Sequence, residues 1–265
     1  MFVWRTFSGR AQARPGAFLA LPALERHGIR AAFTTRTGGV STGPFASLNL
    51  SYFSEDDPGC VRENRALVLG ALGMPPDAWT NGRQVHEARV QRAGRNERGR
   101  GAFTPDTAIE GTDGLWTDEP GVALSVITAD CVPVLLADAQ SRRIATLHAG
   151  WRGLVAGILQ KGVAAIGSSP SDLSAFIGPA IGPCCYEVGD DVAQPARETL
   201  GDSVIVVRKG GTYFDLWAGA RIALASAGVK EIWPAALCTK CESHRLFSHR
   251  AGATARQGLV AVIAP

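Results

Sequence analysis

The sequence predicts a mixed α/β (α+β) fold in a single domain, residues 1–265. Apolar runs at 122–127 and 144–147, and a longer apolar stretch over 121–137, indicate buried strands. Apolar residues at helical spacing over 58–72 and 153–166 predict helices between them. With 265 residues, 46% of them apolar, the chain can bury one sizeable core. No linker or internal repeat divides it, so we expect one domain with a polar surface excursion at about 93–107.

The elements can be assigned in chain order. Residues 31–50 run from a short strand into a glycine-rich loop, and a packing helix begins near Pro58. The segment around His86, flanked by Val85 and Val90, is expected to be strand-like. Further predictions are a turn at 112–114, a strand at 115–116, helices around 191–200 and 216–227, strands at 204–207 and 231–233, and a last strand at 259–263 that closes the sheet.

Charge and composition exclude several function classes. The net charge is +3, and basic residues are scattered apart from 89–100, so no nucleic-acid partner is expected. The stretch 121–137 contains Asp130 and Pro133 and is too short for a bilayer span, so no membrane partner is expected. No apolar signal-peptide core follows Met1, and six cysteines suit reduced thiols; we therefore expect a cytoplasmic protein.

Two residues at strand ends attract attention. Cys131 follows one apolar run, and His148 closes the next, just before the segment 149–153. His86 is a further donor, although a lone histidine is more often a hydrogen-bonded core or rim residue. Two imidazoles and one thiolate suit Zn²⁺ with an open fourth position, where zinc can activate water or polarise a substrate oxygen.

Other polar residues have both a structural and a functional interpretation. Arg36, beside Gly38 and Gly39, suits a phosphate or carboxylate, although such loops are more often plain turns. Arg152 lies at a strand-to-helix junction that can attract anions. Asp113 either faces the site or caps a turn, and capping is the default.

The remaining cysteines follow no clear motif. Cys184 and Cys185 are adjacent in a loop rich in Gly-Pro, and either can face the site. Near the C-terminus, Cys238, Cys241, His244 and His249 superficially resemble a zinc finger, but the spacing is too short for its hairpin and helix. We therefore do not expect a separate metal site there.

Long motifs resemble those of the YfiH-like, laccase-domain family. They include TTRTGGVS with SLNL (34–50), RQVH (83–86), TADCVPVLLAD (128–138), HAGWRG (148–153), IGPAIGPCCYEVG (177–189), FDLWAGAR (214–221) and CT…FSHR (238–250). The resemblance runs collinearly over about 31–263. It implies a four-layer α/β/β/α sandwich similar to the catalytic domain of cytotoxic necrotizing factors, with zinc held by His86, Cys131 and His148. Copper is the alternative metal.

The resemblance also implies an activity. Family members are described as purine nucleoside phosphorylases that also deaminate adenosine and cleave methylthioadenosine, as peptidoglycan editing factors, and formerly as copper-dependent polyphenol oxidases. An open zinc site suits deamination, but no H-x-E motif occurs. Oxidation ranks lower because only five histidines are present. The alternative to an enzyme is a zinc-stabilised binding protein with little turnover.

We expect Arg36 to act with the three metal ligands in catalysis. The substrate, a purine nucleoside with phosphate, is expected to contact Arg36, Asn49, Gln84, Arg152 and Cys184. Glu87 replaces a glycine common in the family and His249 its usual tyrosine, which puts the substrate range in question. A monomer or weak homodimer is expected.

Overall fold

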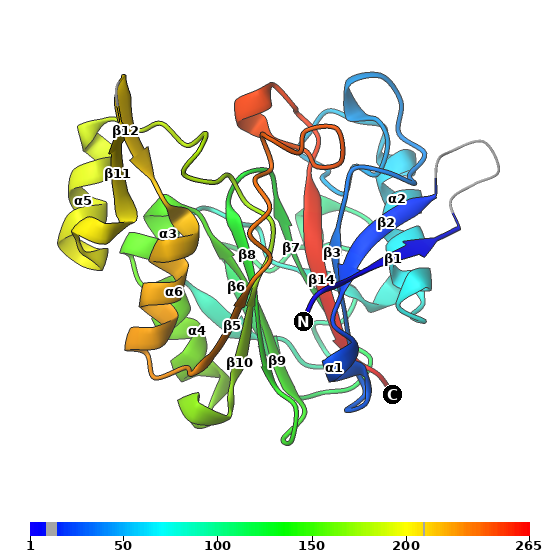
Figure 1. Cartoon of the computed structure of the whole chain (residues 1–265). Coiled ribbons are helices and arrows are strands. Elements are labelled where there is room, and N and C mark those ends of the chain that lie inside the picture. The colour runs from blue at the N-terminus through cyan, green and yellow to red at the C-terminus, as the bar shows by residue number, and fades with distance from the viewer. Residues whose placement is uncertain (9–14, 209) are drawn as a thin grey trace.

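Two six-stranded sheets form the centre of the molecule in a computed structural model, which describes residues 1–8, 15–208 and 210–265 (Figure 1). The first sheet has the order β1 (Val3–Phe7), β2 (Gly16–Ala20), β3 (Ile29–Thr34), β14 (Gln257–Ile263), β7 (Ala123–Thr128) and β4 (Trp79–Asn81). The second has the order β13 (Glu231–Pro234), β10 (Ser174–Ile177), β8 (Val132–Asp138), β9 (Arg143–Ala149), β6 (Gly114–Thr117) and β5 (Val90–Arg92). A separate antiparallel pair joins β11 (Ile205–Arg208) and β12 (Gly211–Phe214).

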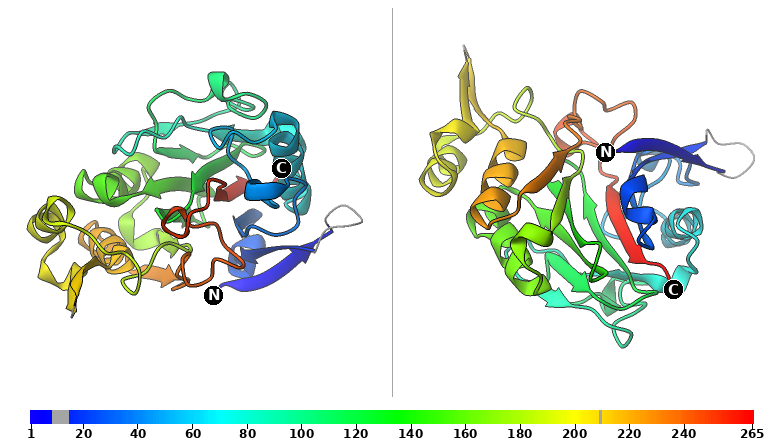
Figure 2. Two further views of the ribbon diagram at one scale, coloured as in Figure 1. Left: turned by 90° about the horizontal axis from the view of Figure 1, so that it is seen from above. Right: turned by 60° about the horizontal axis from the view of Figure 1, so that its bottom comes forward.

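Helices connect the strands and cover the outer faces of the sheets (Figures 1 and 2). They are α1 (Pro22–Glu25), α2 (Pro58–Ala71), α3 (Trp151–Val155), α4 (Ile158–Ile166), α5 (Asp190–Leu200) and α6 (Leu216–Ser226). Short 3-10 helices are η1 (Gly43–Phe45), η2 (Pro76–Ala78), η3 (Pro105–Thr107), η4 (Pro170–Asp172), η5 (Asp202–Val204) and η6 (His249–Ala251). Within the described ranges, no helix is long and apolar enough to cross a membrane.

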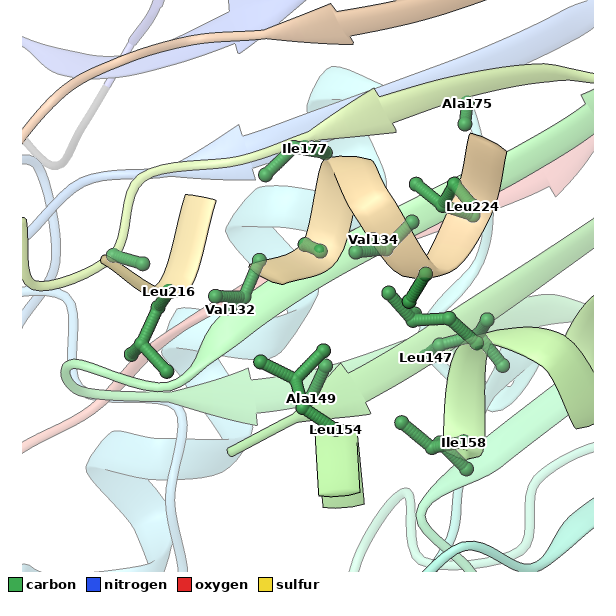
Figure 3. Packing of buried hydrophobic residues seen from close by; sticks show 14 of the residues in the cluster. Val132, Val134, Leu147, Ala149, Leu154, Ile158, Ala175, Ile177, Leu216 and Leu224 are labelled. Carbon is green, nitrogen blue, oxygen red and sulfur yellow. The ribbon is translucent and has the colours of Figure 1, made fainter. Parts of the chain in front are cut away.

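The core has three apolar clusters, and β8 contributes to two of them. Leu135 faces the cluster between the sheets, whereas Val132 and Val134 face the helices. Because neighbouring side chains of a strand point to opposite faces, a strand buried on both faces is apolar throughout, as this one is. Figure 3 shows Val132 near Leu216 and Val134 toward Leu224, both of which belong to α6. The third cluster lies between the first sheet and α2.

Several sequence predictions are confirmed by the elements. The helix expected near Pro58 is α2, whose N-terminus is capped by the Asp57 carboxylate through the N–H groups of Gly59 and Cys60. The mixed α+β class is also confirmed, with both sheets built mainly from antiparallel neighbours. The closer likeness to the necrotizing-factor domain and the single-domain boundary stay predictions.

Three predictions differ from the structure. The helix expected over 153–166 is divided into α3 and α4, because Gly157 adopts a left-handed conformation with φ +80°. The strand at 259–263 does not close its sheet: β14 lies inside it, between β3 and β7, where its residues are buried. The segment around His86 is a bend between β4 and β5, and His86 itself has φ +64°.

Candidate metal centre and its pocket

The pairing of β8 with β9 brings Cys131 to His148. The two strands are antiparallel, with Pro133 opposite His148, so the residue that precedes β8 lies beside the end of β9. His86 reaches the same point from the bend after β4. One donor atom from each of His86, Cys131 and His148 lies within 4.8 Å of the others. The structure therefore brings together the three residues expected to hold a metal.

Asp113 ties the two histidine segments together. Its carboxylate accepts hydrogen bonds of 3.0 Å from each backbone N–H of Val85, His86 and Glu87. It also bonds Nδ1 of His148 at 2.8 Å and is itself fully buried. This leaves Nε2 of His148 free to face Cys131, the orientation that a carboxylate typically imposes on a metal-binding histidine. Asp113 thus both caps the bend and faces the site, although its default prediction was capping alone.

The charges of the site favour a thiolate beside an imidazolium in the metal-free protein. Burial would raise the pKa of the Cys131 thiol, but the charge of His148 and hydrogen bonds from both histidines outweigh it and lower that pKa. Burial would lower the pKa of His148, but the Cys131 thiolate and the Asp113 carboxylate raise it. A metal ligand must be a thiolate, so the environment already favours the form of Cys131 that binds metal.

Gly150 leaves room for the donor atoms. A Cβ atom added there would lie 2.9 Å from Sγ of Cys131 and 3.4 Å from Cδ2 of His86. The backbone after β9 therefore passes against the donor set, where a larger residue would press on it. Two imidazoles and a thiolate in this cradle fit a zinc ion, which takes N and S ligands in a tetrahedral arrangement.

The three donors lie at the wall of a pocket of about 380 Å³. Its other lining residues are Gln84, Ile127, Thr128, Ala129, Asp130, Gly150, Trp151, Arg152, Ile181, Tyr186, Leu216, His249, Arg250 and Arg256. Among the described side chains, the buried Thr128 hydroxyl has no hydrogen-bond partner. A buried polar group without a partner inside the protein is a candidate contact for a ligand.

Gln84 and Arg152 line this pocket, as expected of substrate-binding residues. The Gln84 amide is held by the backbone of Ile127: its Oε1 accepts from the N–H at 2.8 Å, and its Nε2 donates to the carbonyl at 2.9 Å. Arg152 is exposed, with its guanidinium 4.4 Å from the ring centroid of Trp151. Gln84 is therefore fixed in place, whereas Arg152 is free to meet a ligand from the solvent side.

Arg36, in contrast, is not among the described residues that line the pocket. Its guanidinium donates to the carbonyls of Ser243 at 2.7 Å and Ala46 at 3.1 Å, and it packs over the Phe247 ring. Burial lowers its pKa. These contacts hold the glycine-rich loop against the C-terminal segment, which is a structural role, so the proposed phosphate site needs other residues.

Asn49 and Cys184 also lie outside the described lining of the pocket. Asn49 is fully buried; its amide donates to Ser54 and Asp56, and its Oδ1 accepts from the N–H of Arg256 at 3.0 Å. Asn49 therefore affects the pocket indirectly, through its hydrogen bond to the backbone of Arg256. Cys184 is exposed and lies 3.6 Å, sulfur to sulfur, from Cys241.

Comparison with known proteins shows the family of the chain. The profile of the multi-copper polyphenol oxidoreductase laccase family matches residues 30–264. The chain belongs to this family. Within it, the chain is 41% identical over 233 residues to purine nucleoside phosphorylase YlmD of Geobacillus stearothermophilus, an alignment that covers 84% of this chain and 85% of that one. It is 39% identical to a purine nucleoside phosphorylase of Deinococcus radiodurans over 86% of this chain and 87% of that one.

Solved structures of laccase-family proteins have the same fold. The crystal structure of the hypothetical protein YfiH of Bacillus licheniformis matches with a TM-score of 0.88 and 36% identity, over 93% of this chain and 96% of that one. The crystal structure of YlmD from G. stearothermophilus matches with a TM-score of 0.88 and 36% identity, over 98% and 99% of the two chains.

Several pocket residues were not among the site residues predicted from the sequence. Asp130 has φ +91°; its carboxylate accepts from the Arg250 N–H at 2.8 Å and bonds the Thr239 hydroxyl, so it joins the start of β8 to the C-terminal segment. Tyr186, Arg250 and Arg256 complete the wall. All but Arg256 belong to the family motifs, and that membership was the available signal for them.

Proposed function

We propose that this protein is a zinc-dependent purine nucleoside phosphorylase that acts in the cytoplasm, with adenosine deaminase and methylthioadenosine phosphorylase as side activities. The observation that carries the proposal is one pocket that joins an N,N,S donor set to several guanidinium groups. A nucleoside and phosphate need both an apolar surface for the base and positive charge for the anion. The names of the relatives in Geobacillus and Deinococcus support the purine nucleoside phosphorylase activity.

Zinc held by His86, Cys131 and His148 would supply Lewis-acid chemistry at a fourth, open position. The chain's own contribution is to keep Cys131 ionised and to fix the ring of His148 through Asp113. Copper is the alternative metal, because imidazole and thiolate ligands also bind copper ions.

The arginines of the pocket are the proposed phosphate ligands. Arg152 and Arg250 line it from α3 and η6, two elements far apart in the sequence. Arg250 is fixed by a bond to the Glu187 carbonyl at 2.9 Å and by packing over the Tyr186 ring. A guanidinium suits a phosphate because its N–H groups match two oxygens at once. Arg36, proposed for this role from the sequence, keeps only a supporting one.

The base and ribose would lie between the arginines and the donor set. Tyr186 lines the pocket there, and burial raises the pKa of its hydroxyl to about 12, so it stays protonated and can donate. The unpartnered Thr128 hydroxyl and Gln84 are further polar contacts. His249, which departs from the family pattern, lines the same pocket and would affect which base is accepted.

The test is release of free base from inosine and adenosine by purified protein, with and without inorganic phosphate. Phosphate-dependent hypoxanthine and ribose 1-phosphate from inosine are expected from wild type, and ammonia from adenosine indicates the deaminase. Cys131→Ser should remove the activity, whereas Cys60→Ser should keep it, because Cys60 lies on α2 and outside the pocket. Base release that ignores phosphate, or full activity in Cys131→Ser, contradicts the proposal.

A second candidate is oxidation of phenols by copper, which the description of the matching family favours. The same preparations loaded with Cu²⁺ and assayed for oxygen uptake with a phenolic substrate test it. Oxygen uptake at a rate above that of nucleoside cleavage would reverse the order of the two functions.

A further inference from the structure

Four cysteines from two distant segments meet outside the pocket. Cys184 and Cys185 lie in the loop after β10, and Cys238 and Cys241 lie in the segment after β13. Their sulfur atoms all lie within 4.8 Å of one another. From the sequence we expected no separate metal site here, because Cys238 and Cys241 were considered with His244 and His249, at a spacing too short for a zinc finger. The structure pairs them with Cys184 and Cys185 instead.

The spacing of the sulfurs fits a tetrahedral ion. Sγ of Cys241 lies 3.6 Å from that of Cys184 and 3.5 Å from that of Cys185. Four sulfurs at the zinc–sulfur distance of ~2.3 Å lie about 3.8 Å apart in a tetrahedron. A disulfide needs about 2.05 Å. The cluster therefore has the dimensions of a four-thiolate site.

The backbone directs these side chains toward one centre. The chain turns at Cys184 and Cys185, where the N–H groups of Cys185 and Tyr186 both donate to the Gly182 carbonyl, at 2.9 and 3.0 Å. Such a turn allows adjacent side chains to share one side, which a strand forbids. Cys238 and Cys241 have the C-x2-C spacing common in zinc sites.

A backbone N–H group lies against one of the four sulfurs. The N–H of Gly182 donates to Sγ of Cys238 at 3.3 Å. Four thiolates around a divalent ion carry excess negative charge, and cations lie beside them in the chain: Lys240 sits between the C-terminal pair, and Arg208 donates to the Pro183 carbonyl next to Cys184. Polar groups that bond the ligands are a usual accompaniment of a metal site.

We propose that Cys184, Cys185, Cys238 and Cys241 bind a second Zn²⁺ as a closed structural site. Four protein ligands leave no position for substrate, so this ion acts on the fold and not on the chemistry. The site does not depend on the nucleoside activity proposed above.

The ion would cross-link two segments that both line the pocket. Ile181 and Tyr186 line the pocket from the first segment, and His249 and Arg250 line it from the second. Between them the backbone makes a short parallel contact, in which the Ala180 N–H donates to the Leu237 carbonyl at 3.2 Å and the Ala180 carbonyl accepts from the Thr239 N–H at 3.1 Å. A metal cross-link beside this contact adds a constraint that hydrogen bonds alone supply weakly.

The experiment counts zinc in the full-length protein by native mass spectrometry and elemental analysis. Wild type and the control Cys60→Ser should hold two zinc ions per chain. Cys241→Ser should lose one and keep the other, and Cys131→Ser should also lose one, from the pocket. Two zinc ions in Cys241→Ser, or a wild type whose only zinc disappears in Cys131→Ser, would overturn the proposal.

Differential alkylation of the wild type tests the same site without a variant that could misfold. The four thiols should resist alkylation in the native protein and react after a chelator is added, with no reductant. Reaction only after a reductant would show disulfides, and immediate reaction would show free thiols. Either result overturns the proposal, and neither bears on whether the protein cleaves nucleosides.

Discussion

The two sulfur-containing clusters differ in how many donors the chain supplies and in where they lie. The pocket cluster has three donors, with Cys131 and His148 placed by paired strands. The cysteine cluster has four, all from loops. A missing fourth donor leaves a position for substrate, whereas a complete set leaves none. The same metal would therefore serve chemistry in one cluster and loop geometry in the other.

The largest expected effect separates these roles directly. His86→Ala should lower kcat/KM about a thousand-fold, because a Lewis acid worth several kcal/mol is lost. The melting temperature should change little, because His86 is the exposed member of the donor set. Cys238→Ser should do the reverse and lower the melting temperature by roughly 5 to 10 °C, with a smaller effect on kcat. Calorimetry and steady-state kinetics on both variants check this. If both variants changed kcat/KM and the melting temperature to the same extent, the two clusters would not have separate catalytic and structural roles.

Asp113→Asn should weaken zinc binding in the pocket by about 10- to 100-fold, since the amide cannot accept every bond that the carboxylate accepts. Competition with a chromophoric chelator measures the affinity. Asp138→Asn is the matched control: that carboxylate also accepts backbone N–H groups, at 2.9 and 3.1 Å, but in the turn after β8. If Asp138→Asn lost as much zinc affinity, the weaker binding of Asp113→Asn would reflect a general loss of stability and not the lost bonds at the metal site.

Gly150→Ala should weaken zinc binding about tenfold, because the added Cβ would lie 2.9 Å from Sγ of Cys131 and push it off the metal. The cysteine cluster should keep its zinc in this variant. Gly70→Ala on α2 is the control, since a Cβ there meets no atom within 4 Å. Unchanged affinity in Gly150→Ala would show that the segment can shift aside.

The smallest effect concerns the phosphate. Arg36→Ala should leave the KM for phosphate unchanged, because the guanidinium bonds Ala46 and Ser243 away from the pocket. Arg152→Ala should raise that KM about fivefold, the effect of losing one exposed ionic contact. Initial rates over a phosphate series compare the two. A larger rise in Arg36→Ala than in Arg152→Ala would restore the original assignment.

Local patterns predicted most elements and singled out Cys131 and His148, since apolar runs and strand ends are properties of neighbouring residues. The complete donor set with His86 was implied by the family resemblance. Local patterns could not predict which strand lies beside which. β14 pairs on both sides with strands more than 100 residues away in the chain, so its interior position depends on contacts that no local window contains. The split between α3 and α4 depends on one glycine whose φ is positive.

The site shows the same limit. Arg36 was a reasonable phosphate ligand by residue type, but its partners are carbonyls of residues 46 and 243, and the second of these is distant in sequence. The two cysteine pairs were visible separately, and only the meeting of their loops makes one cluster. Residue type indicates what a side chain can bind, whereas the fold decides what it meets.

The hydrogen bonds from residues 85–87 to the Asp113 carboxylate affect how long the segment between them can be. The Arg89 carbonyl accepts hydrogen bonds from the N–H groups of Asp113 and Gly114. These bonds hold the two ends of segment 90–112 next to each other. Residues added near its exposed tip at Asp106 would extend into solvent without moving His86. A label or affinity tag inserted there should therefore leave the pocket intact.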